Sequence, residues 1–162
     1  MLETKFEVLT DFSKKSFVEI MSEVTGEEIE EVEKFSFDGD EMLSIIIGVS
    51  GKTNGRILLN TSVKDGGELA KTMNFGDELE NEDDLYVYLA EFANMFCGRT
   101  ATYINNKFGQ REIWITPPAI FSARDLDVIT PNVTSKQAYY KCSIGSFVVD
   151  VGFSESSSYD EF

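Results

Sequence analysis

Apolar residues recur every three or four positions in two long segments of the chain, and this spacing predicts two amphipathic helices. The first segment covers residues 12–24 and the second covers residues 85–97. A shorter helix is predicted for residues 64–74. Glycine is common immediately after a helix, and Gly26 and Gly98 are predicted to end the two long helices.

Runs rich in β-branched and aromatic residues, bounded by turn residues, predict strands between and after these helices. A turn that contains Asn54-Gly55, a strong hairpin signal, joins the first two runs, and the last two form a hairpin around Gly145-Ser146. Pro117 ends the fourth run, because proline cannot donate a hydrogen bond to a sheet. The predicted strands cover residues 42–50, 56–61, 99–105, 111–116, 138–144 and 147–153. In the last of these, apolar residues alternate with other types, which predicts a half-buried strand.

Polar segments separate these elements. Residues 27–33 are acidic and are predicted to form a solvated connection or a sheet edge. Residues 76–84 and 122–135 are predicted to be loops. The tail, residues 154–162, is rich in serine and acidic residues and is predicted to be disordered. We therefore expect one domain over residues 1–153.

The order of predicted elements, a helix followed by a hairpin, occurs twice along the chain and suggests an internal repeat. Aligning the glycines that follow the two long helices places Glu19 at the position of Glu91. Three residues later, Ser22 takes the position of Asn94. Chance similarity between two amphipathic helices is the alternative explanation. The predicted fold class is α/β, of the α+β type: a mostly antiparallel sheet with two long helices packed together on one face, and a pseudo-twofold internal repeat.

Composition and charge narrow the classes of function. The chain has 162 residues, of which 42% are hydrophobic and 27% are charged, as in ordinary soluble proteins. Its net charge of −15, from 14 basic and 29 acidic residues, disfavours binding to nucleic acid or to an anionic membrane. Since no apolar run reaches the length of a membrane span and the N-terminus lacks a secretory signal pattern, we expect a cytoplasmic protein.

The chain contains no histidine, which removes the commonest general base and a common metal ligand. Its two cysteines, Cys97 and Cys142, lie far apart without the spacing of a zinc site. We interpret both as buried free thiols. No metal site is therefore expected.

Two polar side chains of the second long helix point away from its apolar stripe. At about 100° per residue, Leu89 and Phe92 face inward and Asn94 lies nearly opposite them. Glu91 lies about 60° from Asn94 around the helix and one turn away along it. A solvated helix face is the simplest interpretation of such a pair, and these residues alone favour it.

The positions of a glycine and a proline relative to this pair resemble those of a known family. Glu91-x-x-Asn94 on a helix, followed by Gly98 and then by Pro117 after a strand, is similar to the CheC/CheX/FliY chemotaxis phosphatases. Residues 89–98 resemble the CheX branch in particular.

The resemblance implies a phosphatase that hydrolyses the aspartyl phosphate of a CheY-type response regulator. Asn94 would then position the attacking water, and Glu91 would pair with a lysine of the regulator. The regulator would supply its own Mg²⁺, so that the chain needs no cofactor. Ser22 in place of a second asparagine resembles the one-site CheX pattern more than the two-site CheC pattern. A homodimer joined through sheet edges is also implied.

One departure from the family pattern lies four residues before the glutamate. The family usually has Asp or Ser there, whereas this chain has Val87, with Asp84 one turn earlier as a candidate substitute. Val87 favours an alternative function, a non-catalytic adaptor that docks a response regulator or a flagellar component. A stand-alone hydrolase for small molecules is a third alternative, but the chain lacks a base and a Gly-rich phosphate loop.

Overall fold

The structure is a computed structural model that describes residues 4–37, 39–124 and 134–155. These residues form three helices and seven strands. The helices are α1 (Lys5–Thr25), α2 (Val63–Met73) and α3 (Glu82–Phe108). The strands are β1 (Glu30–Val32), β2 (Glu41–Gly51), β3 (Thr53–Ser62), β4 (Ile113–Ile115), β5 (Ala119–Arg124), β6 (Thr134–Cys142) and β7 (Gly145–Glu155).

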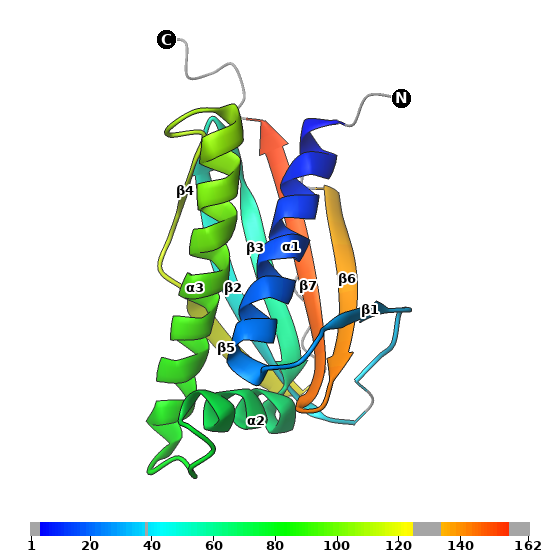
Figure 1. The fold of residues 1–162 in the computed structure, drawn as a ribbon, viewed down its shortest axis with the longest axis vertical. Coiled ribbons are helices and arrows are strands. Elements are labelled where there is room, and N and C mark those ends of the chain that lie inside the picture. The colour runs from blue at the N-terminus through cyan, green and yellow to red at the C-terminus, as the bar shows by residue number, and fades with distance from the viewer. Residues whose placement is uncertain (1–3, 38, 125–133, 156–162) are drawn as a thin grey trace.

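The strands form one antiparallel sheet in the order β1-β6-β7-β3-β2-β4, and β5 pairs with β2 beside β4. Helices α1 and α3 lie side by side on one face of this sheet and run in opposite directions, while α2 crosses one end (Figure 1). The predicted fold class, an antiparallel sheet with two long helices on one face, is confirmed.

A cluster of aromatic rings holds the two long helices on the sheet. Phe17 of α1 is fully buried, and its ring centroid lies 5.6 Å from that of Phe96 and 6.0 Å from that of Phe92, both on α3. The same ring lies 4.7 Å from Tyr140 of β6 and 6.3 Å from Phe147 of β7. Phe17 therefore connects both helices to the centre of the sheet.

Helix α1 begins earlier than the apolar pattern predicts, because a capping box starts it. The hydroxyl of Thr4 accepts a hydrogen bond from the backbone of Glu7, and the Glu7 carboxylate accepts one from the backbone of Thr4. The helix ends at Gly26, whose φ of 74° lies in the left-handed region that glycine adopts without strain. The predicted terminator of the first helix is confirmed.

Gly98 does not end the second long helix, and the strand predicted for residues 99–105 is wrong. Helix α3 continues past Gly98 because Thr100 and Ile104, both fully buried, extend its inward stripe. The hydroxyl of Thr100 donates to the carbonyl of Phe96 at 3.0 Å, so its polar group is satisfied within the helix. Packing against the sheet outweighs the preference of these β-branched residues for strands.

The first hairpin turn lies between the two predicted strands, but it is centred on Lys52, and Asn54-Gly55, predicted to be in the turn, belongs to β3. The side chain of Asn54 braces this turn by accepting a hydrogen bond from the backbone N–H of Gly51 at 3.2 Å. Gly55 lies within β3, where a Cβ would stand 2.0 Å from the carbonyl oxygen of Gly152 on β7. The glycine is thus needed for the close approach of two strands and not for the turn.

The second hairpin turn is Ser143-Ile144, and the predicted turn residues Gly145 and Ser146 begin β7 instead. A Cβ at Gly145 would stand 2.2 Å from the side chain of Asp65 at the start of α2. The carboxylate of Asp65 accepts a hydrogen bond from the backbone N–H of Ser146 at 2.9 Å. This glycine leaves room for a helix contact.

Strand β5 covers residues 119–124, and its last three residues contradict the start of the predicted loop 122–135. It pairs with β2 from Ala119 to Arg124, beyond the prolines that follow β4. The short strands β4 and β5 thus both pair with the long strand β2. The short apolar runs on either side of the prolines do not predict this arrangement. The middle of the predicted loop, residues 125–133, lies outside the described residues.

The acidic segment 27–33 contains β1, which pairs with β6 at an edge of the sheet, so the predicted sheet edge is confirmed. At the other end of the chain, β7 continues to Glu155, into the predicted tail. Residues 156–162 of that tail lie outside the described residues. The single domain over residues 1–153 stays a prediction.

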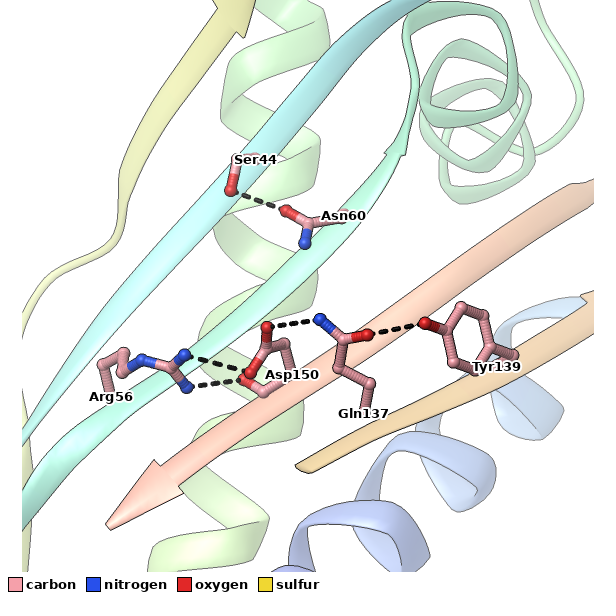
Figure 2. Close-up of polar contacts among 6 residues, drawn as sticks. All are labelled: Ser44, Arg56, Asn60, Gln137, Tyr139 and Asp150. Carbon is pink, nitrogen blue, oxygen red and sulfur yellow. Dashed lines mark hydrogen bonds and ion pairs between the residues drawn. The ribbon is translucent and has the colours of Figure 1, made fainter. Parts of the chain in front are cut away.

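The sheet face opposite the helices carries polar side chains that bond to one another (Figure 2). The guanidinium of Arg56 on β3 lies 3.0 Å from the carboxylate of Asp150 on β7, and the amide of Gln137 on β6 donates to the same carboxylate at 3.0 Å. Asp150 is 4% exposed and Val148 is 6% exposed, so β7 is buried on both faces and not half-buried as predicted. The buried carboxylate is tolerated because it is paired and hydrogen-bonded.

The two long hairpins meet at the centre of the sheet. Strand β3, which ends the first hairpin, pairs with β7, which ends the second, along most of their length. An internal repeat predicts such an arrangement, together with two antiparallel helices on one face. The repeat itself stays a prediction.

Candidate active site

Glu91 and Asn94 both lie on the exposed face of α3, one turn apart. The two residues between them, Phe92 and Ala93, are 0% and 2% exposed. Leu89, one turn earlier, is also fully buried. The packing of these buried residues fixes the rotation of α3 about its own axis, so that Glu91 and Asn94 point outward. The predicted outward direction of the polar pair is therefore confirmed.

Neither Glu91 nor Asn94 makes a side-chain hydrogen bond or ion pair within the described part of the chain. The Asn94 carboxamide therefore keeps two donors and an acceptor for an external group, and the Glu91 carboxylate keeps its acceptor oxygens. A polar pair that its own fold leaves unused is available for contact with a ligand or a partner.

Small residues lie on both sides of Asn94 along the helix. Ala90 and Gly98 are each four residues away and thus share its face. A Cβ at Gly98 would meet no atom within 4 Å, so the packing of the chain does not require glycine there. The surface around the carboxamide is open to close approach by another molecule.

The corresponding pair on α1 is engaged in contacts within the chain. The carboxylate of Glu19 accepts a hydrogen bond from the hydroxyl of Tyr103 on α3 at 2.6 Å, which raises the pKa of that tyrosine. The hydroxyl of Ser22 donates to the carbonyl of Glu27 at 2.8 Å, just beyond the end of α1. Both residues stabilise the fold, so that of these two corresponding pairs only Glu91 and Asn94 remain open.

A second contact fixes α3 against α1 near the pair. The guanidinium of Arg99 donates to both carboxylate oxygens of Glu23, at 2.7 Å and 3.1 Å. This hydrogen bond lowers the pKa of Glu23 and raises that of Arg99. Glu91 and Asn94 are therefore presented from a helix that is held at several points.

The cysteines do not provide a nucleophile at this site. Cys97 is 1% exposed, and burial raises the pKa of its thiol well above the ordinary value. The predicted buried thiol is confirmed there. Cys142 is half-buried, and burial also raises its pKa. A thiol that stays protonated at neutral pH is a weak nucleophile.

Within residues 4–37, 39–124 and 134–155, no cluster of three or more histidine, cysteine, aspartate or glutamate side chains is placed to hold a metal ion. Among the same residues, no helix is long and apolar enough to cross a membrane.

The position one turn before Glu91 is apolar and exposed. Val87 is 62% exposed and lines a shallow depression with Tyr86, Ala90 and Ile120 of β5. Asp84, considered from the sequence as a substitute for the missing polar residue, forms the capping box of α3. Its carboxylate accepts from the backbone of Asn81, which explains its position at the helix start.

Comparison with known proteins decides the family. A family model described as chemotaxis phosphatase CheX matches residues 43–142, more than half of the chain. The chain belongs to the CheX family. The resemblance to the CheX branch is thereby confirmed. No match was found among curated protein sequences.

Solved structures of CheX proteins share the fold of this CheX chain. CheX from Vibrio vulnificus superposes with a TM-score of 0.76 at 14% identity, covering 90% of this chain and 96% of that chain. A chain of the CheX–CheY–BeF3–Mg²⁺ complex from Borrelia burgdorferi gives 0.74 at 18% identity, covering 91% and 98%. FliY from Thermotoga maritima gives 0.62 at 17% identity, covering 94% and 92%.

The sequence predicts the exposed pair of this CheX protein but not the contacts that support it. Glu19 and Tyr103 are far apart in the chain, and so are Glu23 and Arg99. Each of these contacts depends on how the two helices pack. The only sequence signal is a glutamate on the first long helix and a donor on the second.

Proposed function

We propose that this CheX protein hydrolyses the aspartyl phosphate of a CheY-type response regulator, with Glu91 and Asn94 as the working pair. The observation that carries the proposal is the open Glu91–Asn94 face of α3, whose two side chains have no partner among the described residues. The family description as a chemotaxis phosphatase and the CheX–CheY complex of a structural relative support it.

The proposed chemistry suits residues that are neither nucleophiles nor strong bases. Water attacks the phosphorus atom, the bond between phosphorus and the aspartate oxygen breaks, and inorganic phosphate and a free carboxylate result. Phosphoryl transfer needs positioning and charge stabilisation more than covalent help from the protein. The carboxamide of Asn94 can accept a hydrogen bond from the attacking water and donate one to a phosphoryl oxygen. These two bonds hold the water in line with the phosphorus atom.

Glu91 has a different role in this proposal. Its carboxylate pairs with the lysine of the regulator's active site and so orients α3 over the phosphoaspartate. The regulator supplies the Mg²⁺, and the CheX chain contributes no metal or organic cofactor. Loss of Asn94 then affects turnover, whereas loss of Glu91 affects both docking and turnover.

The test is the decay of a phosphorylated CheY-type regulator from the same organism, measured with wild type, Asn94→Ala and Glu91→Lys. We expect wild type to accelerate the decay and both variants to lose most of that acceleration. Matched controls are Asn106→Ala, an exposed asparagine near the end of α3, and Glu33→Lys, an exposed glutamate beyond β1. Both controls should behave as wild type.

A non-catalytic adaptor is the second candidate, and the exposed Val87 favours it, because the family usually has a polar residue there. If wild type binds the phosphorylated regulators but leaves their decay unchanged, the adaptor is correct and the phosphatase is wrong. Equal decay rates with wild type and Asn94→Ala would instead refute the assigned role of Asn94.

We also propose that the protein is cytoplasmic and forms a homodimer through a sheet edge. Strand β6 extends beyond its short partner β1, so residues 134–138 present an edge that no described strand covers. Light scattering of the purified protein tests the homodimer. A mass of one chain at micromolar concentration would contradict it.

A further inference from the structure

A shallow apolar depression lies beside the Glu91–Asn94 pair. It is lined by Tyr86, Val87 and Ala90 of α3 and by Ile120 of β5. Val87 is 62% exposed and Tyr86 is 40% exposed, although both are large apolar side chains. We call these four residues the Val87 patch.

The Val87 patch lies so close to Asn94 that a protein bound at Asn94 also covers the patch. Val87 precedes Asn94 by two helical turns, which is about 10 Å along the axis, and lies about 20° from it around the helix. A protein–protein contact of ordinary size buries about 800 Å² on each partner, equivalent to a disc of about 16 Å radius. A protein that brings a phosphoryl group to Asn94 therefore also covers Val87.

We propose that the Val87 patch is a specificity contact that receives an apolar side chain of the response regulator, close to its phosphoaspartate. The inference rests on the proposed function, because the regulator's position is set by Asn94. A charged or polar group pressed against Val87 and Ile120 would lose its water without gaining a partner. The patch thus selects regulators with an apolar residue at that place and rejects those with a charged one.

The acidic and apolar parts of this face have separate roles. Glu91 contacts a cation at the regulator's active site, whereas Val87, one turn away, contacts an apolar side chain. Ala90 between them is small, so both contacts can form at once. Removal of the apolar contact should weaken docking and leave the positioning of water by Asn94 intact.

The test measures the affinity of the CheX protein for the host's CheY-type regulators, each loaded with beryllofluoride and Mg²⁺. The isosteric variant Val87→Thr, which replaces a methyl group by a hydroxyl, should weaken binding about threefold. Val87→Asp, which places a charge in the patch, should weaken binding tenfold or more. The control is Phe121→Ala, because Phe121 is a 52% exposed aromatic on the opposite sheet face, and it should bind as wild type.

Turnover distinguishes this inference from the proposed function. At saturating regulator concentration, Val87→Asp should hydrolyse the aspartyl phosphate within twofold of wild type, with the loss confined to KM. If wild type binds the regulators but never accelerates hydrolysis, the proposed function is wrong. The binding data still test whether the Val87 patch contacts the regulator. Unchanged affinity of Val87→Asp for every regulator that wild type binds would overturn the inference. So would a shift in oligomeric state without a change in that affinity, because the patch would then join two copies of the chain.

Discussion

Helices α1 and α3 cover the same face of the sheet, and each carries a glutamate followed three residues later by a small polar residue. On α1, Glu19 accepts from a tyrosine of α3 and Ser22 donates to a backbone carbonyl. On α3, Glu91 and Asn94 make no such contacts within the described residues. One pair is committed to stability and the other is open to a partner.

This difference shows that residue types alone do not make a site. A carboxylate that already accepts a strong hydrogen bond is held in one orientation and has fewer acceptor sites left, and breaking that bond to reach a partner costs free energy. The open pair of α3 avoids this cost because other residues hold that helix in place. In the proposed function, α1 supports the fold and α3 carries the working pair, and substitutions on each helix test this division.

The largest expected effect comes from Phe17, the central supporting residue of α1. Phe17→Ala removes a fully buried ring that packs against α3, β6 and β7. The free energy of unfolding should fall by about 3–5 kcal/mol, measured by urea denaturation. Phosphatase activity per folded molecule should fall much less than in Asn94→Ala. A loss below about 1 kcal/mol would contradict the supporting role of α1.

The next effect concerns Glu112, which ties the start of α1 to the hairpin of β2 and β3. Its carboxylate pairs with Lys5 and accepts from the hydroxyl of Thr53 at 3.0 Å. Burial raises the pKa of Glu112, but the hydrogen bonds from Lys5 and Thr53 outweigh burial and hold it below the ordinary value. The ionised form thus stabilises the fold at neutral pH.

Glu112→Gln should lower the free energy of unfolding by about 1–2 kcal/mol at pH 7. Because the pKa is lower in the folded state, this contribution is complete above the unfolded pKa of about 4.3 and disappears as the pH falls through the folded pKa. Urea denaturation from pH 7 to pH 3 should show the two proteins converging in acid. A difference that grows in acid would contradict the assigned direction of the pKa shift.

The smallest effect is a gain in stability at Gly98 on α3. Its added Cβ would meet no atom within 4 Å, and alanine favours a helix over glycine by about 1 kcal/mol. Gly98→Ala should raise the free energy of unfolding by up to that amount. It should also slow dephosphorylation if the regulator approaches α3 closely there. Faster dephosphorylation by this variant would contradict the proposal that the regulator covers the exposed face of α3 at Gly98.

The sequence predicts the features of this molecule that depend on local spacing. The buried stripe of α3 fixes the outward direction of Glu91 and Asn94, and the apolar runs predict most of the strands. The continuation of α3 through Gly98 depends on the packing of Thr100 and Ile104 against other elements, which no local pattern contains. The hairpin turns differ from the predicted ones for a similar reason, since Gly55 and Gly145 are required by contacts with distant residues.

The same limit applies to the candidate site. The sequence identifies two similar pairs, at Glu19 and Ser22 and at Glu91 and Asn94. Only the folded chain shows that the first pair is engaged, Glu19 by Tyr103 of α3 and Ser22 by the carbonyl of Glu27. The Val87 patch likewise requires Ile120, which β5 brings beside α3 although the sequence suggested a loop directly after it.

The most direct test of the difference between the helices is single-turnover dephosphorylation of a phosphorylated CheY-type regulator at saturating CheX protein. Wild type, Ser22→Ala and Asn94→Ala are compared under the same conditions. Ser22→Ala should react within twofold of wild type, and Asn94→Ala should be slower by about 10²-fold or more. If Asn94→Ala is as fast as wild type, or if both variants are slowed equally, the assignment of the working pair to α3 is wrong.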